Sequence, residues 1–363
     1  MDRARITTRR AFLRAAARLG LLLPASWLAA CRATSRTRDA ATDGPFFLTR
    51  GVVLVPDDLT LADWPERAHA AGLTTIALHH GLQPSIVAGF IRSEAGERFL
   101  ADCRRLGLAV EYELHAMGEL LPRELFARDP SLFRVDEKGE RRGDVNLCVH
   151  SRRALDFVAE NALRLDATLP PTTHRRFFWG DDGAPWCRCA ECAALSESDQ
   201  ALIVENHVVA ALRRVDPYAE LAHLAYANTL APPTQVRPVP GVFLEFAPLE
   251  MRFRRQLTSL GDPANAAVLA ALDANLAVFP RATAQALEYW LDDSMYSNWR
   301  RPASELRWSD EAFAADVLLY AARGVRHVTS FAVYLDADYV ARFGFPDAVA
   351  RFGARLRGVT SRR

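Results

Sequence analysis

Lysine is almost absent from this chain of 363 residues. Lys138 is the single lysine, and arginine supplies nearly all of the 45 basic side chains. A Schiff base requires a lysine amine, and a P-loop requires a lysine after its glycine-rich segment. Both kinds of chemistry are therefore excluded at every position other than Lys138.

The chain also lacks an excess of charge of one sign. The formal net charge is +1, and residues 1–30 hold six arginines and one aspartate, so that the remainder carries −4. Because a mildly acidic domain offers no basic surface to a phosphate backbone, we expect no nucleic-acid partner. Half of the residues are hydrophobic, which allows a packed core and excludes wholesale disorder.

The N-terminus lacks a long hydrophobic run. Its apolar stretch, Leu19–Leu28, is shorter than the about 20 residues of a spanning helix. The stretch follows paired arginines in Thr8–Arg14, which resembles a twin-arginine export signal, and it leads into Leu28–Cys31, which resembles a lipobox. We therefore expect an exported periplasmic or cell-envelope lipoprotein, with the membrane contacted only through a lipid on Cys31. Two alternatives are a soluble exported protein cut near Ala30 and an ordinary amphipathic helix.

Three regions follow from this interpretation. Residues 1–31 form the signal peptide with its lipobox, and residues 32–45, rich in small and polar side chains, form a flexible tether. Residues 46–358 form one folded domain.

Short β-rich runs alternate with helical patterns from Phe46 onward. Strands are expected at Phe47–Val55, Thr74–His80, Ala109–His115, Arg176–Asp181, Glu220–Asn228, Gly241–Ala247, Ala284–Asp292 and His327–Leu335. Helices are expected at Leu61–Ala71, Ala95–Leu106, Arg152–Leu165, Gln200–Val215, Ala264–Val278, Asp310–Arg323 and Pro346–Leu356. This alternation predicts a single α/β domain, a (β/α)8 TIM barrel with a long insertion, Ala116–Asn146, after the third strand. An open doubly wound sheet is the alternative, but no glycine-rich phosphate loop follows the first strand.

Acids, amides, histidines and aromatic residues collect where the predicted strands end. In a TIM barrel the C-terminal strand ends form the site, and aromatic rings beside carboxylates suit sugars. The candidates for substrate binding are His79, His80, His115, Trp179, Tyr226, Asn228, Glu288, Tyr289, Trp290 and Asp292.

Two adjacent aspartates, Asp181 and Asp182, follow the fourth predicted strand. Splitting a glycosidic bond requires one acid with a raised pKa and an ionised partner. In substrate-assisted hydrolysis of N-acetylhexosaminides, one carboxylate orients the acetamide and its neighbour protonates the leaving group. We expect Asp182 to be the general acid and Asp181 to hold the substrate, although the two roles could be exchanged. Glu245 is a further catalytic candidate, with Asp292 in reserve. The alternative is a glycine-flanked acidic turn.

Three of the six cysteines stand within six residues: Cys187, Cys189 and Cys192. They could bind a structural zinc ion, with Cys148 or a histidine as fourth ligand. A disulfide within the cluster is an alternative, since an exported protein meets an oxidising compartment, and free thiols are another. No cofactor is expected for the chemistry itself. Cys103 lies in a helical pattern and is expected to be a buried apolar residue.

The sequence resembles a bacterial family of domains of unknown function, related to TIM-barrel hexosaminidases and α-glucuronidases. The resemblance extends from about Leu114 to Ala332, and its most specific element is the Trp-Cys-x-Cys-x-x-Cys motif at residues 186–192. Other resembling stretches are Asp129–Phe133, Asn146–Cys148, Asp181–Gly183, Leu224–Tyr226, Leu244–Pro248 and Glu288–Trp290. The aspartate pair is similar to that of O-GlcNAcase-type enzymes. The resemblance implies a barrel in a carbohydrate context. Members of the family often carry further domains, and we expect this chain to be a minimal, single-domain form.

We therefore expect an exported glycoside hydrolase that acts on an oligosaccharide or glycoconjugate, such as an N-acetylhexosaminide or a uronic-acid glycoside. A non-catalytic carbohydrate-binding lipoprotein on a degenerate barrel is the alternative. A metal-dependent hydrolase is disfavoured, because the first strand, Gly51–Val55, lacks the His-x-His typical of such barrels.

Overall fold

The computed structural model describes residues 44–81, 83–255 and 257–360. The predicted signal peptide, with Cys31, and nearly all of the predicted tether lie outside these residues. Within the described ranges, no helix has both the length and the apolar character needed to cross a membrane.

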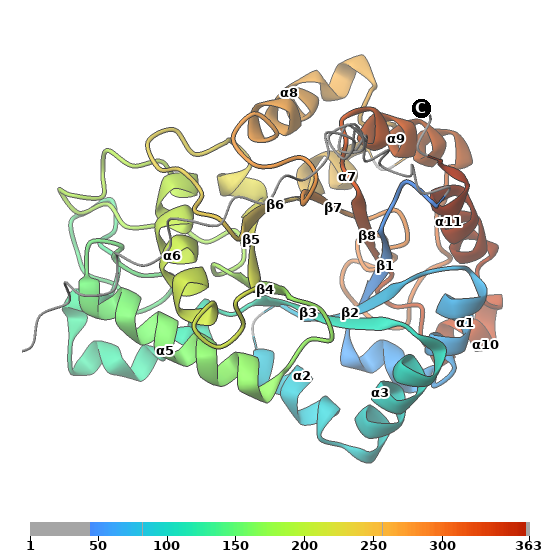
Figure 1. Ribbon diagram of the computed structural model, residues 1–363, viewed down its shortest axis with the longest axis horizontal. Coiled ribbons are helices and arrows are strands. Elements are labelled where there is room, and N and C mark those ends of the chain that lie inside the picture. The colour runs from blue at the N-terminus through green and yellow to red at the C-terminus, as the bar shows by residue number, and fades with distance from the viewer. Residues whose placement is uncertain (1–43, 82, 256, 361–363) are drawn as a thin grey trace, which may run out of the picture. The chain divides into compact units, whose positions relative to one another are not determined.

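Eight parallel strands form a closed barrel in chain order, and β8 pairs with β1 (Figure 1). The strands are β1 (Thr49–Leu54), β2 (Thr75–His80), β3 (Ala109–His115), β4 (Arg175–Trp179), β5 (Glu220–Ala225), β6 (Val242–Phe246), β7 (Gln285–Glu288) and β8 (His327–Phe331). The helices lie around the outside of the barrel. The predicted (β/α)8 TIM barrel is confirmed.

The barrel is buried on both faces, because alternate side chains of each strand point inward and outward. Inward residues such as Val53, Phe177 and Phe243 fill the interior of the barrel. Outward residues such as Val52, Phe178 and Leu244 pack in the larger cluster beneath the helices. This packing explains why the strands are read from the sequence as nearly continuous apolar runs.

Six of the eight strands end earlier than the sequence predicts, whereas β2 and β3 end where predicted. The fifth predicted strand extends to Asn228 and the seventh to Asp292, whereas β5 ends at Ala225 and β7 at Glu288. The residues beyond these points leave the sheet and form turns, as the hydrogen bond from Asp292 N to Tyr289 O (3.2 Å) illustrates. They include aromatic side chains, which favour strands by propensity, but here Tyr226 and Tyr289 line the mouth of the barrel.

The α-helices are α1 (Trp64–Ala70), α2 (Pro84–Ile91), α3 (Glu94–Leu106), α4 (Met117–Leu120), α5 (Arg152–Thr168), α6 (Glu197–Leu212), α7 (Leu249–Arg255), α8 (Ala266–Asn275), α9 (Asp310–Ala322), α10 (Ala337–Phe343) and α11 (Asp347–Gly358). Serine side chains accept N-terminal backbone N–H groups in several of them, for example Ser151 at α5 and Ser309 at α9. The sequence pattern does not predict α2, α4, α7 and α10, which have at most eight residues and so show too few turns of the apolar period.

The segment between β3 and α5 is the predicted insertion. It contains α4 and two 3-10 turns, η2 (Arg123–Ala127) and η3 (Pro130–Leu132), and a bridge between Val135 and Arg141. Its backbone bonds to the loop after β4, because Arg188 N donates to Val135 O at 2.8 Å. The insertion therefore supports the loop that carries Asp181 and Asp182. Three further 3-10 turns are η1 (Pro56–Thr60), η4 (Ala227–Thr229) and η5 (Pro263–Asn265).

Candidate active site

A cavity of about 800 Å³ opens at the C-terminal ends of the strands. Side chains from the ends of β1, β2, β3, β4, β5, β7 and β8 and from the loops that follow them form its walls. Eight of the predicted site residues line it, namely His79, His80, His115, Trp179, Asp182, Tyr226, Tyr289 and Asp292. The structure thus brings together most of the residues selected at the predicted strand ends.

Asp182 lies on the β4 side of the cavity with its side chain 47% exposed. Tyr226 Oη donates a hydrogen bond to Asp182 Oδ1 at 2.9 Å, and His115 Nε2 lies 3.6 Å from the same oxygen. The carboxylate is therefore steadied by neighbouring rings yet remains open to a ligand.

His115 is oriented by the backbone. Its Nδ1 lies 2.7 Å from the carbonyl oxygen of Gly180, which can only accept, so Nδ1 carries the hydrogen and Nε2 is the free nitrogen of the neutral ring. Burial lowers the pKa of His115, against the opposing charge of Asp182. A neutral His115 presents a second acceptor beside Asp182, and a sugar hydroxyl can donate into this pair.

Asp292 lies on the β7 side and is 5% exposed. Ser294 donates to Asp292 Oδ1 twice, from its backbone nitrogen at 2.8 Å and from its hydroxyl at 2.6 Å. Burial raises the pKa of Asp292 to about 7, and the Ser294 hydrogen bonds oppose this rise. Asp292 is therefore a carboxyl group that can hold a proton near neutral pH.

Tyr289 lines the same cavity as the two acids. Burial raises its pKa well above the usual range, and the negative charges of Asp292 and Asp182 act in the same direction. Both carboxyl groups are thus within electrostatic reach of one ring, which stacks on Phe331 at 5.2 Å between centroids.

Asp181 is turned away from the cavity. Arg123 Nη2 donates to Asp181 Oδ2 at 2.5 Å, and Asn146 N donates to the same oxygen at 2.6 Å. Asp181 N in turn donates to Asn146 Oδ1 at 3.0 Å. The adjacent aspartates thus face different surroundings: Asp181 joins the insertion to the β4 loop, and Asp182 faces the cavity. Asn228 also lies outside the cavity lining and donates to Ala184 O at 2.9 Å.

Glu245 is fully buried in the barrel interior and does not line the cavity. Trp179 Nε1 donates to Glu245 Oε2 at 2.9 Å, and Gln285 Nε2 donates to Glu245 Oε1 at 2.9 Å. Burial raises the pKa of Glu245 to about 8. Since Trp179 does line the cavity, Glu245 holds the indole ring in place.

Glu288 and Trp290 face the helices instead of the cavity. Arg252 of α7 donates to both carboxylate oxygens of Glu288, at 2.7 and 2.9 Å, and Trp290 packs on Phe313 of α9. Residues of a strand alternate between its faces, so Glu288 and Trp290 share the outer side while Tyr289 faces the cavity.

The cavity lining also contains residues outside the set selected from the sequence, among them Trp299, Arg301 and Tyr334. Arg301 Nη2 donates to the buried Asp58 at 2.7 Å, and its guanidinium lies 4.3 Å from the centre of the Tyr334 ring. Trp299 and Tyr334 have positive φ angles of 53° and 74°, a strained geometry that often marks functional sites. Trp299 and Arg301 belong to the long loop between β7 and α9, whose sequence has no periodic pattern that would place them at the site. Tyr334 could have been selected from the sequence, because it lies at the end of the eighth predicted strand.

Part of the chain that forms this site matches a known family. Residues 90–270 match the domain of unknown function DUF4838. The DUF4838 segment runs from α2 into α8 and includes the insertion, the cysteine motif, Asp182 and Tyr226. Asp292, Trp299 and Arg301 lie beyond it.

The barrel is similar to solved glycoside hydrolase structures. A β-N-acetylhexosaminidase from Bacteroides fragilis is 13% identical, with a TM-score of 0.53 over 88% of this chain and 67% of that chain. Gan42B, a GH42 β-galactosidase from G. stearothermophilus, is 13% identical, with a TM-score of 0.54 over 88% of this chain and 58% of that chain. This chain therefore spans between about half and two thirds of their lengths. The comparison with curated proteins yields no match. At these identities the likeness establishes the TIM-barrel fold.

Proposed function

We propose that this protein is a glycoside hydrolase that cleaves an O-glycosyl bond in the cavity at the mouth of the barrel. The observation that carries the proposal is the presence of two carboxyl groups in different settings, Asp182 and Asp292, on the walls of one aromatic-lined cavity. Asp182 follows β4 and Asp292 follows β7, three strands further around the barrel. A sugar ring can stack on Trp299, Tyr226 or Tyr289 between them.

The raised pKa of Asp292 favours a division of roles between the acids. Asp292, with its pKa raised to about 7, is the proton donor to the leaving oxygen in our proposal. Asp182, which accepts a hydrogen bond from Tyr226 and lies beside His115, is the ionised partner. This assignment departs from the expectation that Asp182 donates the proton and Asp181 binds the substrate. Asp181 and Glu245 become positioning residues, because each holds a neighbour of the cavity.

A screen of chromogenic glycosides, with N-acetylglucosaminides and glucuronides included, tests the proposal. Cleavage of any of them by the purified protein, lost when the cavity acids are replaced, supports a hydrolase. Binding of oligosaccharide without cleavage of any glycoside would instead support the non-catalytic carbohydrate-binding protein.

Turnover should decrease as the pH rises above about 7. The reason is that Asp292 must be protonated to act as a general acid, and its raised pKa of about 7 sets the point at which the proton is lost. The measurement is kcat/KM against pH with a substrate whose leaving group is poor. An Asp292→Asn variant that keeps the same alkaline decrease would assign that decrease to another group.

We also propose export through the twin-arginine route, with a lipid attached to Cys31. The paired arginines and Cys31 lie outside the described residues. Replacing Arg9 and Arg10 together by lysine should retain the precursor inside the cell, because that translocase recognises the paired guanidinium groups. Cys31→Ser should shift the exported protein from the membrane fraction to the soluble fraction. Cell fractionation measures both, and normal export of the double variant would contradict the signal assignment.

A further inference from the structure

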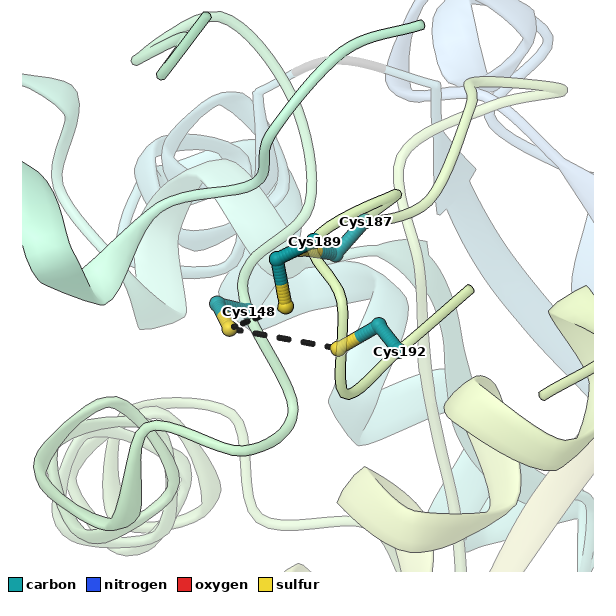
Figure 2. A group of neighbouring side chains, drawn as sticks. All are labelled: Cys148, Cys187, Cys189 and Cys192. Carbon is teal, nitrogen blue, oxygen red and sulfur yellow. Dashed lines mark hydrogen bonds between the residues drawn. The ribbon is translucent and has the colours of Figure 1, made fainter. Parts of the chain in front are cut away.

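Four cysteines from two separate segments converge beside the insertion (Figure 2). Cys148 precedes α5, whereas Cys187, Cys189 and Cys192 lie in the loop between β4 and α6. Their Sγ atoms all lie within 4.8 Å of one another. Cys148 Sγ is 3.8 Å from Cys189 Sγ and 3.9 Å from Cys192 Sγ.

We infer that these four cysteines bind one zinc ion as a tetrahedral tetrathiolate site that fastens the insertion to the loop after β4. Zinc–sulfur bonds of about 2.3 Å in a tetrahedron place neighbouring sulfurs about 3.8 Å apart. The two measured separations match that edge length. They are nearly twice the about 2.05 Å of a disulfide bond. Binding requires no oxidant or reductant: four thiols give up their protons, and four sulfur–zinc bonds form.

The surroundings of the sulfurs fit a site with excess negative charge. Four thiolates and one Zn²⁺ carry a net charge of −2, which hydrogen-bond donors to sulfur can stabilise. Val135 N donates to Cys187 Sγ at 3.3 Å, and His150 Nδ1 lies 3.2 Å from Cys192 Sγ. These donors come from the insertion and from the segment just before α5.

The backbone around Cys187 is held by a buried glutamine of α6. Gln200 Nε2 donates to Cys187 O at 3.1 Å, and Cys187 N donates to Gln200 Oε1 at 3.1 Å. Gln200 is 0% exposed. The cysteine loop is therefore fixed in position by a neighbouring helix, which is typical of a preorganised metal site.

A bound metal would help to hold the cavity rim at Asp182 in place, because only a few residues connect Cys148 to Asp182. Cys148 lies two residues after Asn146, which hydrogen-bonds Asp181 in both directions, and Asp181 precedes Asp182. Zinc is thus a structural ion that positions this rim. Its effect on turnover rests on the proposed function, whereas its binding does not.

Metal analysis of the full chain, purified without chelators, tests the site. We expect about one zinc per chain, released in step with thiol modification when a mercurial reagent is titrated in. Cys192→Ser should lose its zinc to a chelator concentration that leaves the wild type loaded. Cys103→Ser is the matched control, because Cys103 is a buried cysteine of α3 outside the cluster, and it should keep its zinc.

Several results would overturn the inference. Wild-type protein that contains no zinc after incubation with the metal, or whose mass is lower by the two hydrogens of a disulfide among these cysteines, excludes the site. One iron per chain in place of zinc would contradict the choice of metal. If Cys192→Ser does not fold, the stoichiometry and mercurial release of the wild type still decide the question. All of these readouts are independent of glycosidase activity.

Discussion

Replacing Asp292 by asparagine should lower turnover by about 10²- to 10⁴-fold, which is the usual contribution of a general acid. The amide keeps the size of the side chain and can retain a carbonyl oxygen for the two Ser294 hydrogen bonds, but it has no acidic proton. Substrate binding should persist, because the asparagine side chain would occupy the same place on the cavity wall. The measurement is kcat and KM on a substrate that the wild type cleaves.

The leaving group provides the internal control. A substrate with a very good leaving group requires no protonation, so the loss in Asp292→Asn should be much smaller for it. Asp182→Asn should lower turnover whatever the leaving group, since the partner acts by charge. If the loss in Asp182→Asn, and not the loss in Asp292→Asn, depends on the leaving group, Asp182 is the proton donor. Full activity of both variants would mean that neither Asp182 nor Asp292 takes part in the mechanism.

Replacing Arg252 by methionine should lower the free energy of unfolding by about 3–5 kcal/mol, the usual effect of breaking a buried ion pair from one side. Arg252 is 1% exposed and bonds two carboxylates that are fully buried, Glu288 at 2.7 Å and Asp316 at 2.6 Å. Methionine fills a similar volume but leaves both acids without a cation. Urea denaturation followed by circular dichroism measures the change.

Arg254→Met is the matched control on the same helix. Its side chain is 74% exposed, and its nearest acid, Glu250, is 3.9 Å away. An exposed pair of this kind contributes little, so the control should unfold at nearly the same denaturant concentration as the wild type. A similar shift in both variants would mean that the buried network adds nothing beyond helix propensity and size.

The barrel could be predicted from the sequence because its signal is local and repeated. Buried parallel strands such as β1 and β6 are mostly apolar in sequence, and the caps Ser93 and Gly107 mark the ends of α3. Each unit adds independent evidence for the same fold, so errors of a few residues at the boundaries do not change the conclusion.

The site was predictable in part for a geometric reason. Successive residues at a strand end point to opposite sides. Once the end of β7 is known, Tyr289 can be assigned to the cavity side, and Glu288 and Trp290 to the helix side. Which of the adjacent residues Asp181 and Asp182 faces the cavity depends on Arg123 and Asn146, which bond Asp181 and lie far away in the sequence.

The raised pKa of Asp292 and the place of Arg301 depend on burial and on long-range partners. Arg301 meets Asp58 across more than 240 positions of the chain, and no local pattern encodes such a contact. Sequence reasoning could therefore identify Asp292 as a candidate at a strand end but could not rank it above the aspartate pair.

The cavity is assembled from two parts of the chain, of which only one matches a known family. One wall, with His115, Asp182 and Tyr226, comes from the segment that matches DUF4838, and the facing wall comes from the loop after β7 and the end of β8. A change in the loop between β7 and α9 would therefore alter the facing wall of the cavity, while the wall next to the cysteine-bearing loop would keep its shape.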